Sequence, residues 1–357
     1  MSKKTAIVLV NYKDYVNRFL VECRDSLRSQ NYPKDLFAVY IVDNASSPES
    51  RKYIGETYPE AVIVPRSDGN YSAANNAGIK KGAEDGCEYF VIANMDTRFD
   101  ANWLAELIRA LESGSDVGLV QSKILLYPKN QAEWGKLRIN SLGNIIHFLG
   151  FGMTSFYNEP DREIAGWPEI NGYASGCSLA IKKEVLDKIG GYNEEYYMYH
   201  DDIEVSWKVK LAGYKIVLAP KSIVYHKYEF SRSMTMVFYM ERNRYITVLA
   251  FYKPLTLLLI LPAMILMDLG VLMYSLAGGW FKVKLKVYGY FLKAESWKKI
   301  IKFRQELNSI RRLSDREIVK PFTGKILFQE INNPPLQYIA NPLFSAYWAI
   351  IKKIIFW

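Results

Sequence analysis

The chain has 357 residues, half of them apolar, which is enough for a substantial core and excludes global disorder. Its net charge of +9 requires an anionic partner, such as nucleic acid, an anionic lipid surface or a phosphorylated small molecule. Residues 281–320 carry twelve Lys and Arg against four Asp and Glu, directly after the most apolar stretch, which favours lipid headgroups over nucleic acid. Three widely spaced cysteines lack metal-ligand spacing and are typical of reduced thiols in a cytosolic protein.

The first 121 residues alternate short apolar runs with longer helical patterns. The pattern predicts strands at 7–10, 37–42, 61–64, 89–93 and 117–121. It predicts helices at about 15–29, 49–57, 72–82 and 101–112. Strands that alternate with helices indicate a parallel sheet with helices on both faces, and shorter strands from about 120 to 230 make the later pattern mixed.

Polar clusters follow three of these strands: Asn11-Tyr12, Asp43-Asn44 and Asn94-Met95-Asp96. In such sheets ligands bind beyond the carboxyl ends of the strands, so we expect these clusters to meet at one site. Neither the dinucleotide-binding glycine fingerprint nor a P-loop is present. Carboxylates at strand ends instead suit a divalent cation that bridges a diphosphate.

Two later segments complete the pattern. Residues 172–181 form a small-residue turn that enters an apolar strand, and residues 196–204 lead into a helix that extends to about residue 212. Asp201 and Asp202 stand at the start of this helix, and Gly213 follows its end. The helix carries a buried stripe with i, i+4, i+8 spacing, made of Ile203, Trp207 and Leu211.

Six segments in this order resemble glycosyltransferase family 2, a large family of inverting enzymes with the GT-A fold. Within it the chain looks most like rhamnosyltransferase-type enzymes of glycan assembly. The matching segments cover much of residues 5–230 and are 7–12, 42–46, 70–78, 93–97, 172–181 and 199–213. The resemblance implies an α/β fold, a Rossmann-like nucleotide-diphospho-sugar transferase domain with a mixed sheet.

The resemblance also implies roles for individual residues. Asn11, Tyr12 and Asp43 would line the base and ribose of the nucleotide, together with Asn44. Asn94-Met95-Asp96 stands where the family has its Asp-x-Asp motif, so Asp96 would bind Mg²⁺ or Mn²⁺ and Asn94 would lie beside the donor. His226 matches a histidine that completes the metal site in some members. The small residues that include Ser72 and Asn75 favour close approach to the nucleotide, or else form only a tight helix start.

Asp202 matches the family's catalytic base, with Asp201 as the alternative. An inverting transfer needs a base that takes the proton of the acceptor hydroxyl. We expect the helix N-terminus to lower the pKa of Asp202. Other roles are open from sequence alone: the acids at 43 and 96 as turn or cap residues, Asp201 and Asp202 as N-caps, and His226 as a packed core histidine. Arg232, Arg242 and Arg244 suit either a diphosphate or solvent.

Residues 254–280 are long and apolar enough to span a bilayer, with Asp268 as their only charge. A single span would place the basic block 281–320 on the far side from a cytosolic active site, against the positive-inside rule. We therefore expect Pro262, Asp268, Gly270 or Gly278-Gly279 to break the helix, and residues 341–357 to lie in the interface. Residues 251–357 would form a helical platform, with a basic helix at 290–313, at the cytoplasmic face of the plasma membrane. The alternative is a buried helical hairpin in a soluble dimer.

The sequence thus predicts a transferase domain at 1–250 and a helical membrane-associated region at 251–357. It would move one sugar from a nucleotide-sugar, with dTDP-L-rhamnose favoured and UDP-hexose second, to a polyprenyl-diphosphate-linked saccharide. Two other functions remain open at this point. One is a metal-dependent sugar-nucleotidyltransferase or pyrophosphatase, and the other is an inactive scaffold of glycan assembly.

Overall fold

The computed structural model describes residues 3–229, 234–327 and 334–357. It divides the chain into two compact units, which are treated separately below. The sheet unit comprises residues 1–144, 154–209 and 214–229, and the helical unit comprises 145–153, 210–213 and 230–357. The sequence set the boundary at 250, whereas the longest segment of the helical unit starts at 230 and two short earlier segments belong to it as well.

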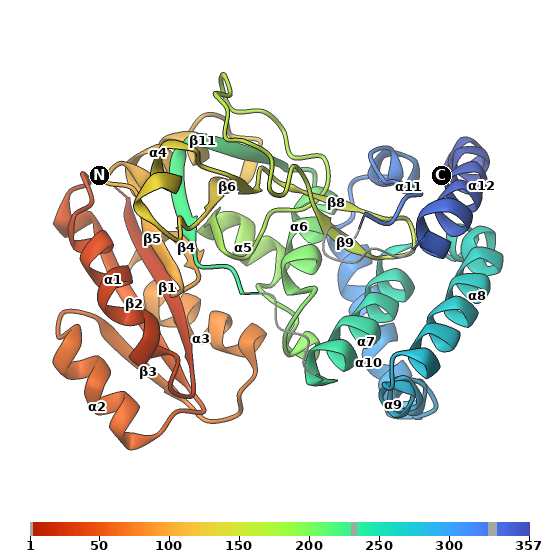
Figure 1. Ribbon diagram of the computed structural model, residues 1–357, viewed down its shortest axis with the longest axis horizontal. Coiled ribbons are helices and arrows are strands. Elements are labelled where there is room, and N and C mark those ends of the chain that lie inside the picture. Colours follow the sequence, from red (N-terminus) through yellow and green to blue (C-terminus); the bar gives the residue numbers. More distant parts are fainter. Residues whose placement is uncertain (1–2, 230–233, 328–333) are drawn as a thin grey trace. The chain divides into compact units, whose positions relative to one another are not determined.

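The sheet unit is built on a mixed sheet, which has nine strands among the described residues (Figure 1). The strands are β1 (Lys4–Tyr12), β2 (Phe37–Asn44), β3 (Val62–Arg66), β4 (Cys87–Ala93), β5 (Thr97–Phe99), β6 (Val117–Leu126), β7 (Ile139–Ser141), β10 (Ser178–Lys182) and β11 (Lys215–His226). Their order is β3-β2-β1-β4-β10-β6-β11-β5, with β7 beside β6. Strands β1–β4 pair in parallel, and β10 runs antiparallel to both β4 and β6. Strands β8 (Asn144–Ile146) and β9 (Gly152–Thr154) pair as a separate ribbon.

The helices of this unit are α1 (Val16–Arg28), α2 (Pro48–Thr57), α3 (Tyr71–Glu84), α4 (Trp103–Leu111), α5 (Lys183–Ile189) and α6 (Asp201–Leu211). Three short 3₁₀ turns are η1 (Lys34–Leu36), η2 (Gln131–Gly135) and η3 (Glu194–Tyr196). Every strand and helix predicted through residue 121 is confirmed, with ends that shift by a few residues. The helix that begins at Asp201 and its buried stripe are confirmed as well.

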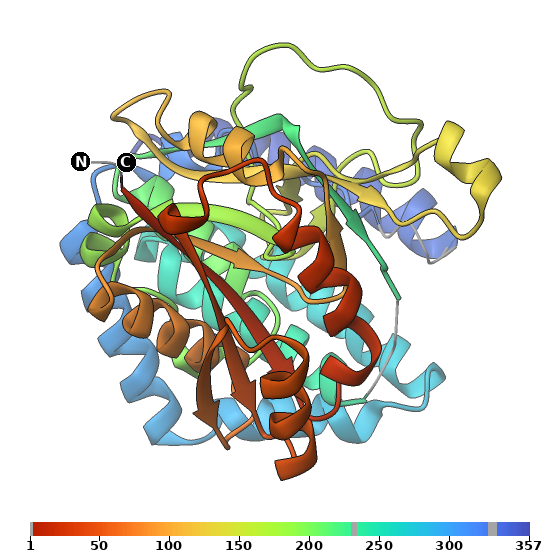
Figure 2. The ribbon, with the colours of Figure 1, turned by 90° about the vertical axis from the view of Figure 1, so that its left-hand side faces the viewer.

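The two faces of the sheet are covered differently. Alternate residues of β1, such as Ile7 and Leu9, face a core shared with α1, α2 and α4. The other face packs against α3, and Figure 2 shows α1 and α3 on opposite sides of β1. A Cβ on Gly78 would lie 2.4 Å from Val8 Cγ1, so only glycine lets α3 approach this closely.

The polar clusters gather at one edge of the sheet, as the sequence predicted. Asn11 lies opposite Asp43 at the ends of β1 and β2. Ser178, the first residue of β10, lies opposite Ala93, the last residue of β4. Because β10 is antiparallel, its start lies at the same edge as the carboxyl ends of the parallel strands.

The helical unit contains α7 (Met234–Phe251), α8 (Pro254–Ala277), α9 (Phe281–Phe291), α10 (Ala294–Ile310), α11 (Asp315–Val319), the π-turn η4 (Leu336–Ala340) and α12 (Asn341–Ile354). The expected break inside the apolar stretch is wrong at Pro262, Asp268 and Gly270, since α8 is one continuous helix through all three. The chain turns only at Gly278-Gly279, where Gly279 has a φ of +73°.

A buried ion cluster explains why the charge in α8 does not break the helix. Lys284 of α9 lies 2.7 Å from both Asp268 and Glu241, and it is fully buried. Arg244 also pairs with Glu241 at 3.0 Å and bonds to the Leu149 carbonyl. Asp268 is thus neutralised inside protein, and no turn into water is needed.

The cluster also engages Arg244, which the sequence left open as a diphosphate ligand. Arg244 is 2% exposed and its guanidinium is used within the helical unit. Arg242 is buried too and bonds to Asn243. Arg232 lies outside the described residues.

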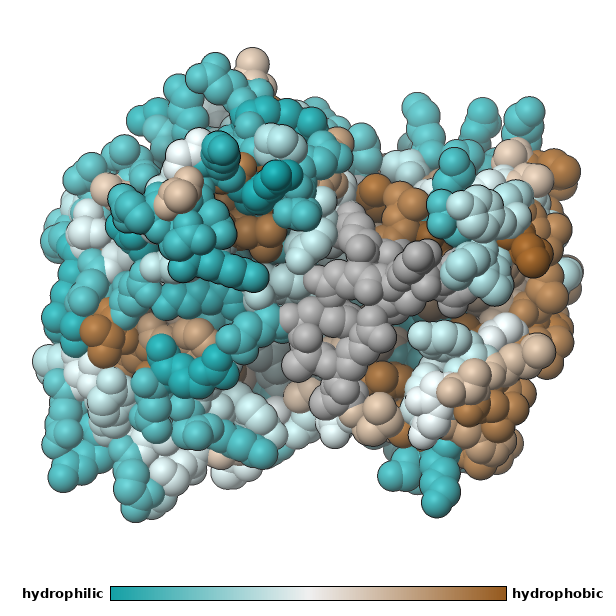
Figure 3. Space-filling view, viewed as in Figure 1, coloured by the Kyte–Doolittle hydropathy of each residue, from teal (hydrophilic) through white to brown (hydrophobic). Residues whose placement is uncertain are grey.

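An apolar surface covers part of the helical unit, and Figure 3 shows hydrophobic residues gathered over α8 and α12. Its members are more than two fifths exposed: Leu255, Leu258, Leu261, Ile265, Leu269, Met273 and Leu276 on α8, and Leu343, Ile350 and Ile354 on α12. Within the described residues, α8 alone is long and apolar enough to cross a membrane, a property that core helices of soluble proteins share. Unlike such core helices, α8 is only 22% buried over its most apolar 18 residues.

Candidate active site

The centre of the candidate site is a pair formed by Asp96 and His226. Asp96 follows β4, and its Oδ2 atom accepts a hydrogen bond of 2.6 Å from the Tyr15 hydroxyl. The same oxygen lies 3.5 Å from His226 Nε2 at the end of β11. Asp96 Oδ1 is buried and has no hydrogen-bond partner among the described residues. An orphaned carboxylate oxygen of this kind fits a cation ligand.

The other ring nitrogen of His226 is also fixed. Nδ1 lies 2.8 Å from Oδ1 of Asn140, so Nδ1 is the donor and Nε2 faces Asp96. A histidine whose second nitrogen donates to an amide oxygen has the orientation typical of a metal ligand. Asp96 Oδ1 and His226 Nε2 therefore form a two-atom donor set.

Electrostatics at this pair favour a positive charge. Burial lowers the pKa of His226, but Cys177 and Asp96 beside it outweigh burial and raise the pKa to about 10. Burial acts to raise the pKa of Asp96, yet the adjacent His226 and Tyr15 keep it below its usual value. The site thus holds a proton in the place where a metal cation would bind, and metal binding would release that proton.

Two protein ligands are enough for Mg²⁺ or Mn²⁺ where phosphates and water complete the coordination. Across residues 3–229, 234–327 and 334–357, no group of three or more His, Cys, Asp and Glu gathers as a metal site. Mg²⁺ is usually held by one or two carboxylates together with substrate phosphates and water. Asn94, at the first position of the motif, accepts a hydrogen bond from the Tyr71 hydroxyl at 3.3 Å through its Oδ1 atom.

Asp202 lies in the first turn of α6. Its Oδ1 accepts from the Ile203 amide at 2.9 Å, and its Oδ2 accepts from the Gly176 amide at 3.4 Å. Burial nevertheless raises the pKa of Asp202 to about 6. The expectation that the helix N-terminus would lower this pKa is wrong, because the loss of solvation exceeds the effect of these hydrogen bonds. A carboxylate with this pKa is a stronger base than an ordinary aspartate and is still mostly ionised at pH 7.

Asp201 is buried more deeply beside it. Burial, together with the charge of Asp202, raises the pKa of Asp201 to about 8. At neutral pH the pair therefore carries one proton and one negative charge, and the charge resides mainly on Asp202. This division of roles agrees with Asp202 as base and Asp201 as its protonated neighbour.

A short loop connects Asp202 to the pair of Asp96 and His226. The Asn94 amide donates to the Cys177 carbonyl at 3.0 Å, and the amide of the preceding residue, Gly176, donates to Asp202. Thr97 pairs with His226, since β5 lies antiparallel to β11. Asp96, His226 and Asp202 are thus held at one edge of the sheet by the ends of β4, β10 and β11.

The approach to α6 is strained. Tyr197, Tyr199 and His200 have φ angles of +64°, +62° and +62°, which are left-handed conformations that non-glycine residues rarely adopt. Each costs on the order of 1–3 kcal/mol, and such strain clusters at functional sites. The strain falls directly before Asp201 and Asp202.

The residues predicted to line the nucleotide divide into two groups. Asn11 and Asp43 are fully buried and bonded to each other at 2.9 Å, and Arg51 donates to Asp43 at 2.8 Å. Asn44 is also buried, between the Gly69 amide and the Asn70 carbonyl. Tyr12 is 41% exposed at the end of β1. Through these bonds the buried residues Asn11, Asp43 and Asn44 hold the ends of β1 and β2 in place. Contact between a nucleotide and any of the four residues stays a prediction.

Ser72 and Asn75 lie on the buried face of α3, which Asn70 caps through a bond from the Ala73 amide. Asn75 donates to the Tyr71 carbonyl at 3.2 Å. Ser72 Oγ and Asn75 Oδ1 have no hydrogen-bond partner among the described residues. Their contact with a nucleotide also stays a prediction.

Sequence reasoning missed four residues that position this site: Tyr15, Arg51, Tyr71 and Asn140. Three of them contact groups that the sequence did identify, but from 23 to 86 positions away along the chain. Arg51 is eight positions from Asp43 and looks like an ordinary helix residue. No spacing in a single sequence marks such contacts.

The chain is similar to several curated proteins over about half to two thirds of its own length. It is 28% identical over 234 residues to the uncharacterized protein y4gI of Sinorhizobium fredii, covering 63% of this chain and 24% of that protein. It is 26% identical over 242 residues to the O-antigen biosynthesis protein RfbC of Myxococcus xanthus, covering 63% and 17% respectively. A third relative is an N-acetylglucosaminyl-diphospho-decaprenol L-rhamnosyltransferase of Mycobacterium tuberculosis, at 23% identity over 212 residues and 53% and 66% coverage. The chain thus spans a quarter or less of the first two relatives.

Solved structures confirm the fold that the sequence resemblance implied. GalNAc-T7, solved with UDP, GalNAc and Mn²⁺, superposes with a TM-score of 0.52 at 15% identity, covering 70% of this chain and 50% of that one. TarS of S. aureus superposes with a TM-score of 0.51 at 14% identity, covering 98% and 53%. A sequence model described as Glycosyl transferase family 2 matches residues 6–190, more than half of the chain. The chain belongs to glycosyl transferase family 2.

Proposed function

We propose that this chain is an inverting glycosyltransferase that moves one sugar from a nucleotide-sugar to a hydroxyl of a lipid-linked saccharide in cell-surface glycan assembly. The observation that carries the proposal is that Asp96, His226 and Asp202 share one edge of the sheet. The name of the mycobacterial relative supports L-rhamnose as the transferred sugar and a diphospho-prenol-linked sugar as acceptor, so dTDP-L-rhamnose remains the favoured donor. UDP-hexose is the second donor class.

Asp202 is the base in this proposal. It accepts the proton of the acceptor hydroxyl as that oxygen attacks the anomeric carbon, and the carbon–diphosphate bond breaks on the opposite face. The amides of Gly176 and Ile203 hold its carboxylate in place. Because an alcohol is a very weak acid, the proton moves to Asp202 only as the new bond forms.

Asp96 and His226 would hold the divalent cation, which when bound offsets the charge of the departing diphosphate. Tyr15 and Asn140 keep these two ligands oriented. In this proposal the nucleoside binds at the ends of β1 and β2 and its diphosphate extends toward Asp96 after β4, which the strand order β2-β1-β4 supports. Tyr12, exposed at the end of β1, is then available to contact the nucleoside.

The helical unit is proposed to lie on the cytoplasmic face of the membrane. The exposed leucines and isoleucines of α8 and α12 would enter the lipid, and Asp268 is already paired inside protein. Exposed lysines on α9 and α10 would contact anionic headgroups: Lys282, Lys286, Lys298, Lys299 and Lys302. A membrane-held acceptor follows from this placement.

A donor panel tests the function. The full chain with Mn²⁺ is titrated with dTDP-rhamnose, UDP-hexoses and GDP-mannose, and thermal stabilisation identifies the donor. Transfer is then measured with a prenyl-diphosphate-linked N-acetylglucosamine. Nucleotide release that needs no acceptor would instead favour a pyrophosphatase, and donor binding without any turnover would favour an inactive scaffold.

Vesicle flotation tests the membrane placement. The chain is expected to float with vesicles of phosphatidylcholine and phosphatidylglycerol, and Leu258→Glu combined with Ile265→Glu should abolish flotation. Val21→Glu is the matched control, because Val21 is an exposed apolar residue of the sheet unit. Unchanged flotation of the double variant would exclude α8 as the membrane contact.

A further inference from the structure

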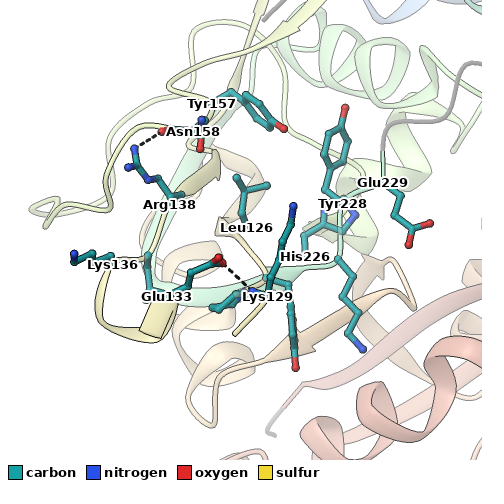
Figure 4. A pocket seen from close by; sticks show the side chains of 14 residues that line it. Leu126, Lys129, Glu133, Lys136, Arg138, Tyr157, Asn158, His226, Tyr228 and Glu229 are labelled. Atoms are coloured by element: carbon teal, nitrogen blue, oxygen red, sulfur yellow. Dashed lines mark hydrogen bonds between the residues drawn. The ribbon is translucent and has the colours of Figure 1, made fainter. Parts of the chain in front are cut away.

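A pocket of about 690 Å³ lies in the sheet unit beside His226. It is formed by the ends of β6 and β11 and by two loops, residues 127–138 and 157–158. Figure 4 shows Arg138, Lys136 and Glu133 along one side, with His226 and Tyr228 along the other. None of the predicted nucleotide-lining residues belongs to its lining.

Three cations of this pocket lack an anionic partner. Within the described parts of the chain, Lys129, Lys136 and Arg138 form no ion pair, and Arg138 only donates from Nη1 to the Asn158 carbonyl at 2.9 Å. All three are exposed. Arginine and lysine side chains in this state are available to bind phosphate oxygens.

The acids of the pocket are engaged elsewhere. Glu229 pairs with Arg18 at 2.9 Å, and Glu133 accepts hydrogen bonds from the Lys129 amide and Asn130 within its own loop. Lys227 forms an ion pair with Glu22. Among the described residues, the pocket therefore has three cations without an ion-pair partner and one carboxylate, Glu133, without one. This excess of positive charge favours binding of an anion.

Tyrosine rings stand next to these cations. Tyr157 and Tyr228 pack edge to face with ring centroids 5.9 Å apart, and Tyr228 lies 5.6 Å from the His226 ring. A pocket that joins aromatic rings to cations fits a ligand that carries both a sugar and a phosphate.

The topology decides between donor and acceptor. The sheet order β2-β1-β4-β10-β6-β11 places Asp96, after β4, between the ends of β1 and β2 and the ends of β6 and β11. A nucleoside bound at β1 and β2 would have its diphosphate at Asp96 and His226, which lie 3.5 Å apart. The pocket begins at His226 and extends away from β1 and β2, so it would be left for the acceptor.

The base is close to the same side of the sheet. The Gly176 amide donates to Asp202, and the carbonyl of the following residue, Cys177, accepts from the Asn94 amide. Asn94 lies two residues before Asp96, which contacts His226 in the lining of the pocket. Asp202 and the pocket are thus linked through the same Asp96–His226 pair.

We propose that this pocket binds the phosphate-bearing portion of the acceptor through Lys129, Lys136 and Arg138. The inference rests on the proposed function, because it assumes a nucleoside at β1 and β2. It adds a specificity: the acceptor is recognised by its diphosphate, and an uncharged glycoside of the same sugar is a poor substrate.

The test uses the full chain with Lys136→Gln and Arg138→Gln combined. Acceptors are N-acetylglucosamine linked through a diphosphate to a short prenyl chain, and the same sugar as an uncharged alkyl glycoside. The double variant should raise KM for the diphosphate acceptor by about tenfold or more. The donor KM and the rate with the uncharged glycoside should not change. Lys80→Gln, an exposed lysine of α3, is the matched control.

A rise in donor KM instead would assign the pocket to the donor diphosphate, and an unchanged acceptor KM would overturn the proposal. Calorimetric titration with the prenyl-diphosphate sugar measures acceptor binding directly, so it tests the pocket separately from the proposed sugar transfer. Binding that is lost in the double variant supports the pocket even if no donor is transferred. Equal binding by wild type and variant rejects the pocket whether or not transfer occurs.

Discussion

The pH dependence of turnover follows from the burial of Asp202. Its pKa is about 6, compared with the usual value of 3.8. A base acts in its ionised form, so kcat/KM should rise with pH through 6. With this pKa about nine tenths of the enzyme is active at pH 7 and about one tenth at pH 5. An unperturbed aspartate would remain more than about 90% ionised at pH 5.

The predicted change is thus about a tenfold loss of kcat/KM between pH 7 and pH 5. Asp202→Asn should lower kcat by about 10²–10⁴-fold and remove the acid limb that this base produces. Donor binding, measured by thermal shift with Mn²⁺, should persist in this variant. Asp116→Asn provides a control, since Asp116 is an exposed carboxylate that pairs with Lys215 at the opposite end of β6.

Two results would refute this reasoning. A profile that stays flat from pH 7 to pH 5 would mean that burial does not raise the pKa of the base. Retention of more than a tenth of wild-type kcat by Asp202→Asn would remove Asp202 from the reaction. Such retention together with a large loss in Asp201→Asn would assign the base to Asp201.

The remaining predictions concern stability and metal binding. Asp201 has a folded pKa of about 8 against a usual 3.8, so between these values the folded state binds more protons and its stability falls as pH rises. Asp201→Asn should therefore raise Tm more at pH 8 than at pH 5, and an equal gain would contradict the pKa. Glu241→Gln leaves Lys284 buried without its full partner set and should cost about 3–5 kcal/mol in urea unfolding, whereas the exposed Lys282→Gln should have little effect. Asn140→Ala should weaken Mn²⁺ binding by about 10–100-fold in calorimetry, and unchanged affinity would argue against His226 as ligand.

Much of the sheet unit could be predicted from local sequence pattern. The alternation of apolar runs and helical segments gave strands β1–β4 and β6 in their correct positions, because a buried strand needs an apolar run whatever its neighbours are. Asp43 and Asp96 were singled out for a related reason, and Asp202 by its place at a helix start together with the family resemblance. Polar residues directly after a buried strand, or directly before a helix, are placed by the ends of those elements.

The tertiary structure decided the features that depend on distant contacts. Insertion of β10 between β4 and β6 makes the sheet mixed and brings Gly176 to Asp202. Pairing of Lys284 with Asp268 lets α8 continue where the sequence suggested a break. Neither contact has a local signal, because each joins segments whose spacing along the chain is arbitrary.

The pKa of Asp202 shows the same division most clearly. The sequence correctly placed this residue at a helix N-terminus, which stabilises a negative charge. Burial acts in the opposite direction and exceeds that effect. Desolvation is the sum over all atoms that exclude water from the carboxylate, and those atoms belong to segments brought together only by folding. The sequence determined that an acid stands at this helix start, and the folded structure determined how strongly that acid holds its proton.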